Sequence, residues 1–152
     1  MTGSLRCVID TNICIKLFMI DALTPKANQL FEHLNNPSTE IFIPDFLYLE
    51  CSNVFCKYVR AKLYTVQQVQ EYLTALKVFN FQVISTNDLV EEAFQIALEY
   101  GIKAYDGCYV ALSKQVDAPL LTLDQRLINS LSRSSFRIQL FTDFIIPPLE
   151  IG

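Results

Sequence analysis

The chain has 152 residues, which is enough for one domain with a complete hydrophobic core. Hydrophobic residues make up 51% of it, above the usual share for a soluble domain, and this excess favours a buried interface between subunits over the alternative of a large core. The net charge of -4 normally argues against a nucleic-acid partner, but without the four acids of a candidate site the acidic and basic residues are equal in number, so composition does not exclude binding to a phosphate backbone.

The predicted elements alternate between apolar strand-like runs and helical patterns. In chain order they are a strand at 7–10, helices at 11–19 and 25–35, a strand at 41–43, helices at 46–63 and 66–79, a strand at 81–84, helices at 88–100 and 104–115, a strand at 120–123, a short helix from 124 and an edge strand at 136–141. Repeated strand–helix units predict an α/β fold, a three-layer sandwich with a central, mainly parallel sheet of four to five strands. We expect one domain over residues 1–152.

Small polar residues mark the expected helix starts, because their side chains satisfy the free N–H groups of a first turn. The expected caps are Thr11, Asp45, Thr65 and Asn87. Gly101 is expected to end the helix that precedes it. His33, the one histidine, is expected on a surface helix without a functional role.

Four acidic residues occupy positions that a parallel sheet brings together. Asp10 and Asp124 each follow an apolar strand-like run, while Glu50 and Asp106 each interrupt an apolar helical stretch. In open α/β sheets, sites form outside the carboxyl ends of the strands. Carboxylates gathered there repel one another by about 4 kcal/mol per pair at ~4 Å and an effective dielectric of ~20, so the group requires a positive partner such as a divalent ion. Oxygen ligands favour Mg²⁺ or Mn²⁺, and such a site supports phosphoryl chemistry.

Each acid also has an ordinary structural explanation. Asp10 and Asp124 could cap helices, although Thr11 could cap the first helix instead and leave Asp10 free for a metal ion. Glu50 could lie on the exposed face of an amphipathic helix, and Asp106 could interact with the positive end of its helix. We favour the metal site for Asp10 and Asp106. For Glu50 and Asp124, the residue and its neighbours favour neither the metal site nor the structural explanation.

The five cysteines are odd in number and include no C-x-x-C pair, which predicts free, mostly buried thiols in a reducing compartment. We find no leader-like start and no apolar run of the ~18 residues that a membrane span needs. We therefore expect a cytoplasmic protein with no membrane partner.

Four motifs carry the acidic residues. They are Val8-Ile9-Asp10-Thr11-Asn12, Glu50 in its helix, Tyr105-Asp106-Gly107-Cys108-Tyr109-Val110-Ala111-Leu112, and Leu121-Thr122-Leu123-Asp124-Gln125-Arg126-Leu127. In order and spacing they resemble the PIN-domain family, most of all the small VapC-type toxins of toxin–antitoxin pairs. The resemblance runs from Val8 to about Phe141. Gly107 departs from it, because the family more often has alanine there, and glycine costs ~1 kcal/mol in helix propensity.

The resemblance implies a metal-dependent ribonuclease with Mg²⁺ or Mn²⁺ as cofactor. The acids that match the family's four acidic positions are Asp10, Glu50, Asp106 and Asp124. We predict that Asp10 and Asp106 bind the ion directly. Glu50 and Asp124 are predicted to complete its ligand shell, directly or through water.

Partners and supporting residues follow from the same resemblance. Thr11 or Asn12 is predicted to hold the attacking water or a phosphate oxygen by hydrogen bonding. RNA is the implied substrate, and the implied protein partners are a second copy in a homodimer and an antitoxin protein.

Basic and aromatic side chains near the acids are candidates for contacts with RNA. The basic candidates are Lys57, Arg60 and Lys62 on the helix of Glu50, and Lys103, Lys114 and Arg126 beside the later acids. Tyr48, Tyr105 and Tyr109 are candidates for stacking on bases, with packing in the core as the favoured alternative. Ordinary solvated charge is the alternative for each basic residue.

The sequence leaves three other functions open. The chain could be a PIN nuclease of RNA processing that is not a toxin, a phosphatase that uses Asp10 as nucleophile, or a non-catalytic protein-binding module. Phosphatase chemistry of that kind usually wants a second acid two residues on, and here that residue is Asn12.

Overall fold

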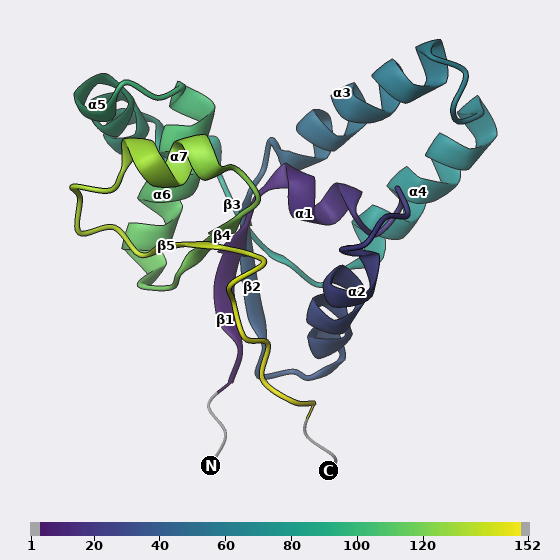
Figure 1. Ribbon diagram of the computed structural model, residues 1–152, viewed down its shortest axis with the longest axis horizontal. Coiled ribbons are helices and arrows are strands. Elements are labelled where there is room, and N and C mark those ends of the chain that lie inside the picture. The colour runs from purple at the N-terminus through teal and green to yellow at the C-terminus, as the bar shows by residue number, and fades with distance from the viewer. Residues whose placement is uncertain (1–3, 150–152) are drawn as a thin grey trace.

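The computed structural model describes residues 4–149, and in that range five parallel strands form one sheet with the order β3-β2-β1-β4-β5 (Figure 1). The strands are β1 (Arg6–Ile9), β2 (Glu40–Pro44), β3 (Gln82–Ile84), β4 (Leu120–Thr122) and β5 (Ile138–Leu140). The helices are α1 (Thr11–Ile15), α2 (Thr24–Glu32), α3 (Leu47–Arg60), α4 (Val66–Val78), α5 (Val90–Tyr100), α6 (Ala104–Val116) and α7 (Gln125–Ser130), with short 3-10 turns η1 (His33–Asn35) and η2 (Thr86–Asp88).

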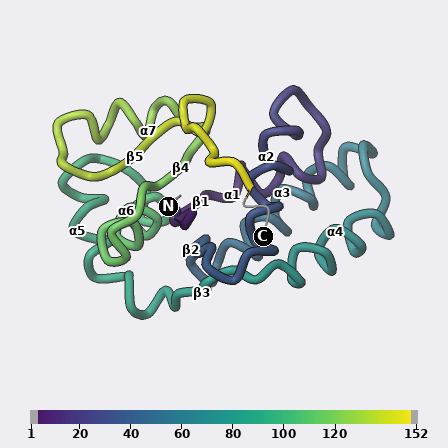
Figure 2. Tube along the Cα trace, turned by 90° about the horizontal axis from the view of Figure 1, so that it is seen from below, coloured from purple at the N-terminus to yellow at the C-terminus, as the bar shows by residue number. Residues whose placement is uncertain are grey.

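Helices cover both faces of the sheet, which confirms the three-layer α/β architecture expected from the sequence. Helices α1 to α4 lie on one side and α5 to α7 on the other, as both views show (Figures 1 and 2). Helix α6 packs directly on β1 and β2. Because β1 lies at the centre and is covered on both faces, its residues Cys7, Val8 and Ile9 are completely buried, and the strand reads as a continuous apolar run.

Three of the expected helix caps are wrong, namely Thr11, Asp45 and Asn87. Asp10, not Thr11, caps α1, because the chain is still extended at Asp10 and its carboxylate accepts the N–H of Ile13. Helix α1 ends at Ile15, short of the expected residue 19. Asp45 does not cap α3 but accepts hydrogen bonds from the backbone N–H and the hydroxyl of Thr86.

Of the remaining helix boundaries, one differs from the expectation and two agree with it. Helix α5 begins at Val90 without a side-chain cap, and Asn87 lies in η2, whose cap is Ser85. Thr65 caps α4 as expected, in a reciprocal capping box with Gln68. The expected end at Gly101 is also confirmed, since this residue is left-handed with φ of 67°.

His33 is buried rather than exposed, which corrects the expectation of a surface position. It is 5% exposed, and its Nε2 lies 2.8 Å from the carbonyl oxygen of Pro147. The cause is tertiary, because the C-terminal segment passes over the end of α2 and covers the ring.

The five cysteines are free, and four of them are buried, as the sequence predicted. Within residues 4–149, no helix combines the length and apolar character that crossing a membrane requires.

Gly107 lets α6 approach α5 closely. A Cβ atom built on Gly107 would lie 2.5 Å from the carbonyl oxygen of Ala93, a backbone atom of α5. We predict that Gly107→Ala destabilises the protein by about 1–3 kcal/mol, because this overlap outweighs the ~1 kcal/mol gained in helix propensity. Urea denaturation measures the change.

The matched control is Gly101→Ala, where an added Cβ meets nothing within 4 Å but the left-handed backbone is retained. Its cost is limited to the ~1–2 kcal/mol of that conformation. A Gly107→Ala protein as stable as the wild type would mean that α5 and α6 can separate at little cost.

Candidate active site

The four acidic residues line one cavity of about 360 Å³. Asp10 directly follows β1 and Asp124 lies two residues beyond β4, and these neighbouring parallel strands end at the same edge of the sheet. Glu50 and Asp106 stand in the first turns of α3 and α6. None of the four forms an ion pair with a lysine or arginine in the range 4–149. Four segments distant in sequence therefore deliver carboxylates without a described ion pair to one place.

Asp10 is held by hydrogen bonds on both carboxylate oxygens. Oδ1 accepts from the backbone N–H of Ile13 at 3.4 Å, and Oδ2 accepts from the hydroxyl of Thr122 at 2.6 Å. Burial raises the pKa of Asp10 to about 6; these hydrogen bonds oppose the rise, and the charge of Asp106 adds to it. Asp10 thus both caps α1 and lines the cavity.

Glu50 is oriented by two buried hydroxyl groups that share one of its oxygens. Tyr109 donates to Oε1 at 2.7 Å and Thr11 donates to the same atom at 2.8 Å, while the two hydroxyl oxygens lie 3.0 Å apart. Burial raises the pKa of Tyr109, and the charge of Glu50 raises it further, so the phenol stays protonated and can donate. The Thr11 hydroxyl is engaged with Glu50, whereas Asn12 lines the cavity and is exposed.

Asp106 lies beside two other acids of the group. Burial raises the pKa of its carboxyl, the negative charges of Asp124 and Glu50 raise it further, and Lys103 opposes the rise. Its neighbours therefore disfavour the ionised form. A cation placed among these groups would reverse that effect.

Thr122 connects the acids of the two strand ends. Its fully buried hydroxyl donates to Asp10 and accepts the backbone N–H of Asp124 at 3.0 Å. Asp124 in turn caps α7, since its Oδ1 accepts the N–H groups of Arg126 at 2.9 Å and Leu127 at 3.4 Å. One side chain thus fixes the relative position of two acidic residues.

The chemistry of the cavity fits a hard divalent ion. The side chains that could donate to an ion are carboxylates, without His or Cys, and a bound cation would relieve their mutual repulsion. Among residues 4–149, no three or more His, Cys, Asp or Glu side chains are arranged to hold an ion by themselves. Mg²⁺ does not require such a cage, because it usually binds to one or two carboxylates and keeps several waters.

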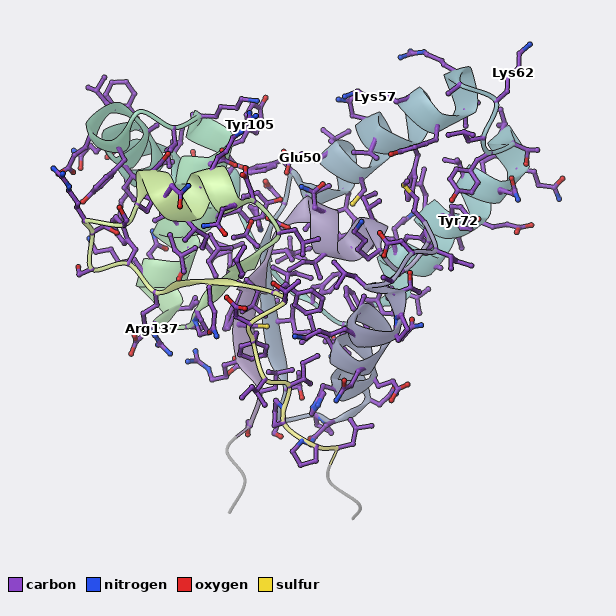
Figure 3. The ribbon with its side chains drawn as sticks, viewed as in Figure 1. Glu50, Lys57, Lys62, Tyr72, Tyr105 and Arg137 are labelled. Atoms are coloured by element: carbon purple, nitrogen blue, oxygen red, sulfur yellow. The ribbon has the colours of Figure 1, made fainter. Side chains whose placement is uncertain are left out.

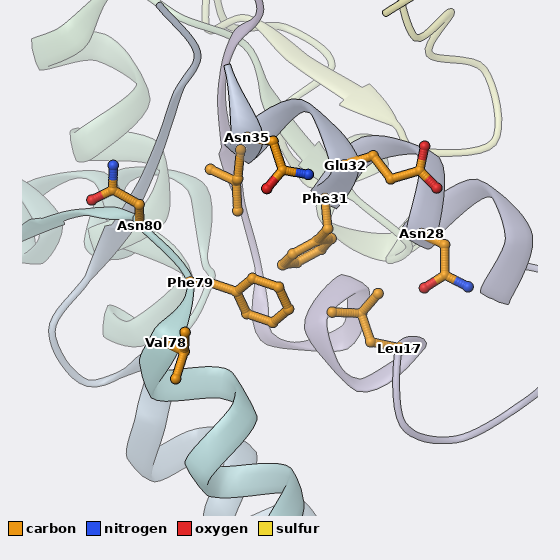
Figure 4. Close-up of a pocket in the computed structure, with 9 residues that line it drawn as sticks. Leu17, Asn28, Phe31, Glu32, Asn35, Val78, Phe79 and Asn80 are labelled. Atoms are coloured by element: carbon orange, nitrogen blue, oxygen red, sulfur yellow. The ribbon is translucent and has the colours of Figure 1, made fainter. Parts of the chain in front are cut away.

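A larger cavity of about 540 Å³ lies elsewhere, between Leu17, the α2–η1 segment and the end of α4 (Figure 4). Its lining combines apolar side chains such as Phe31 and Phe79 with amides such as Asn28. Glu32 is the one carboxylate among the described residues that line it. It offers no converging charged groups, so the smaller acidic cavity is the candidate active site.

Sequence reasoning missed the roles of Thr122 and Tyr109 in the site. A signal was present for both, because a hydroxyl in a buried apolar run needs a hydrogen-bonding partner. Thr122 interrupts such a run in β4, and Tyr109 lies three residues after Asp106 on an apolar helix. Their acceptors, Asp10 and Glu50, come from distant segments and could not be read from the sequence.

Comparison with known proteins agrees with this geometry. Residues 7–131 match the family model described as PIN domain. The chain belongs to the PIN domain family. A curated PIN relative, Ribonuclease VapC3 from Pyrobaculum aerophilum, is 26% identical over 130 residues, which cover 81% of this chain and 92% of the relative. The family expected from the four motifs is therefore confirmed.

Solved structures show the same PIN fold. PAE2754 from Pyrobaculum aerophilum superposes with a TM-score of 0.67 at 18% identity, over 93% of this chain and 90% of the other. A toxin–antitoxin complex from Klebsiella pneumoniae gives 0.61 at 20% identity, over 89% and 97%. VapBC2 from Rickettsia felis, bound to a DNA fragment from its promoter, gives 0.58 at 16% identity, over 90% and 98%.

Proposed function

We propose that this PIN protein is a metal-dependent endoribonuclease that hydrolyses phosphodiester bonds with Mg²⁺ or Mn²⁺ as cofactor. The observation that carries the proposal is the convergence of four carboxylates on one cavity without a described ion pair to neutralise them. Membership of the PIN domain family and the likeness to Ribonuclease VapC3 support RNA as the substrate.

In this proposal Asp10 and Asp106 bind the ion directly, and Glu50 and Asp124 complete its ligand shell, directly or through water. Bound there, Mg²⁺ or Mn²⁺ would supply Lewis-acid stabilisation of the charge that develops on the phosphate. The exposed amide of Asn12 is suited to donate a hydrogen bond to a phosphate oxygen at the cavity.

The hydroxyl groups around the acids preorganise the site. Thr11 and Tyr109 hold Glu50, and Thr122 holds Asp10, so these carboxylates need little rearrangement when a phosphodiester arrives. The negative charge of the four acids would repel RNA in the absence of a metal ion, because both are anionic. RNA binding and ion binding are therefore expected to support each other.

The direct experiment is to incubate the purified protein with a fluorescently labelled single-stranded RNA. We expect cleavage with Mg²⁺ or Mn²⁺ and loss of cleavage, by roughly 10²-fold or more, when EDTA is present. Re-addition of the ion in excess over EDTA should restore the rate. Equal rates with and without EDTA would contradict a metal-dependent mechanism.

We further propose that the enzyme is the toxin of a toxin–antitoxin pair, which the named toxin–antitoxin structures of similar fold support. Its proposed partners are an antitoxin protein and a second copy of the chain. An exposed row of apolar side chains on α5 supports self-association, since Val90, Phe94 and Leu98 are 49%, 62% and 73% exposed. An enzyme that cleaves RNA but leaves cell growth unchanged on expression would instead be a PIN nuclease of RNA processing.

A further inference from the structure

Two lysines line the acidic cavity, and neither forms a described ion pair with its carboxylates. Lys57 of α3 and Lys103, just before α6, both contribute to the cavity wall. Both are exposed, and in the part of the chain that the structure describes neither forms an ion pair. Lys103 is close enough to Asp106 to oppose the rise in the pKa of that carboxyl. Lys114, in contrast, is paired with Glu92.

Along the polar face of α3, the charge of the side chains changes from negative to positive. Glu50, Asn53 and Lys57 follow at intervals of three and four residues, which places them on one side of the helix, and all three line the cavity. Figure 3 shows Lys57 farther along α3 than Glu50. This face therefore presents an acid at the proposed ion site and a free cation beside it.

Tyr105 supplies a fixed aromatic ring on the α6 side. It is 59% exposed, and its ring packs edge-on against Phe46 with 5.3 Å between centroids and an interplanar angle of 84°. Figure 3 shows it on the opposite side of Glu50 from Lys57. Tyr109 cannot take this role, because it is 3% exposed and its hydroxyl is bound to Glu50. The structure thus distinguishes the exposed Tyr105, which can stack on a base, from the buried Tyr109, which cannot; the sequence alone did not.

We propose that Lys57, Lys103 and Tyr105 form a binding surface for single-stranded RNA on both sides of the acidic cavity. The lysines contact the phosphates that flank the bond to be cut, and Tyr105 stacks on a base. A lysine beside an anionic pocket is complementary to a phosphate backbone, and an exposed aromatic ring can stack only on a base that is free of a duplex. The proposal rests on the proposed ribonuclease function and names the form of its substrate.

The test measures binding apart from cleavage. All variants carry Asp106→Asn, and the binding of a labelled single-stranded RNA of ten nucleotides in Mg²⁺ is followed by fluorescence anisotropy. We expect Tyr105→Ala to weaken binding by roughly 5- to 150-fold, the range found for one base–aromatic stack, and Tyr105→Phe to retain it. Lys57→Ala and Lys103→Ala should each reduce the slope of log affinity against log salt by about 0.7.

The matched control is Lys77→Ala, because Lys77 is exposed on α4 and has no ion pair within residues 4–149. Its salt slope should equal that of the parent protein. The proposed surface is wrong if Lys57→Ala and Lys103→Ala leave the salt slope unchanged, or if Tyr105→Ala leaves the affinity unchanged. It is also wrong if a fully paired RNA duplex binds equally well, or if the parent protein binds no RNA.

The two proposals fail separately. If the wild-type protein does not cleave RNA but the binding results are as expected, the catalytic function is wrong and the surface stands. If the wild-type protein cleaves RNA in a metal-dependent manner but the substitutions change neither affinity nor salt slope, the surface is wrong and the catalytic proposal stands.

Discussion

Asp106→Asn is expected to reduce RNA cleavage in Mg²⁺ or Mn²⁺ by roughly 10²–10³-fold or more, the scale on which removal of one charge-stabilising group acts in other enzymes. The protein should nevertheless fold normally. Burial and the charges of Asp124 and Glu50 already raise the pKa of the Asp106 carboxyl, so a neutral amide at this position relieves repulsion. Single-turnover cleavage of a labelled RNA, together with thermal unfolding, measures both quantities.

Asp143→Asn is the matched control for this substitution. Asp143 is exposed and does not line the acidic cavity, so the same change of charge should leave the cleavage rate near that of the wild type. Wild-type rates in a well-folded Asp106→Asn protein would remove Asp106 from the mechanism. Equal losses in both variants would indicate that the total charge of the protein, rather than the cavity, governs the rate.

Much of the fold could be predicted because burial on both faces leaves a simple pattern. The central strands β1 and β4 are mostly apolar and buried, and each is expected from the sequence at nearly the position observed. Helix caps were harder to assign, because the segment from Ser85 to Asp88 offers several residues able to cap. The contact between Asp45 and Thr86, which joins the ends of the paired strands β2 and β3, determines the role of Asp45, and the sequence does not reveal it.

The acids of the candidate site were predictable for a similar reason. A carboxylate directly after a buried strand, such as Asp10, must lie at the sheet edge where parallel strands end. Capping a helix and lining the cavity do not exclude each other for Asp10, since it does both. What the sequence could not supply were pairings across the fold, such as Thr122 with Asp10 and Tyr109 with Glu50, because these depend on how the layers pack.

The stability of the metal-free protein is expected to fall as pH rises from about 4 to about 6, as far as Asp10 contributes. The pKa of Asp10 is about 6 in the folded protein, against 3.8 for an unperturbed aspartate. The folded state therefore binds this proton more tightly than the unfolded state, so the contribution is complete below pH 3.8 and lost as pH rises through 6. A shift of this size corresponds to about 1–3 kcal/mol.

The difference between the wild type and Asp10→Asn isolates this contribution from those of other titrating groups. Asparagine is a good helix cap, because its side-chain oxygen can still accept the N–H of Ile13. Its amide N–H can donate to the Thr122 hydroxyl, which reverses the direction of the hydrogen bond in the wild type, so the variant keeps the local structure. In EDTA, urea denaturation should show that the free energy of unfolding of Asp10→Asn rises relative to that of the wild type between pH 4 and pH 6. At pH 7 the variant should be more stable by about 1–3 kcal/mol. With Mg²⁺ or Mn²⁺ the wild type alone should recover, because ion binding to the folded state stabilises it. Parallel pH curves for the two proteins in EDTA would mean that solvent reaches Asp10 freely and that its carboxylate is not destabilised by burial.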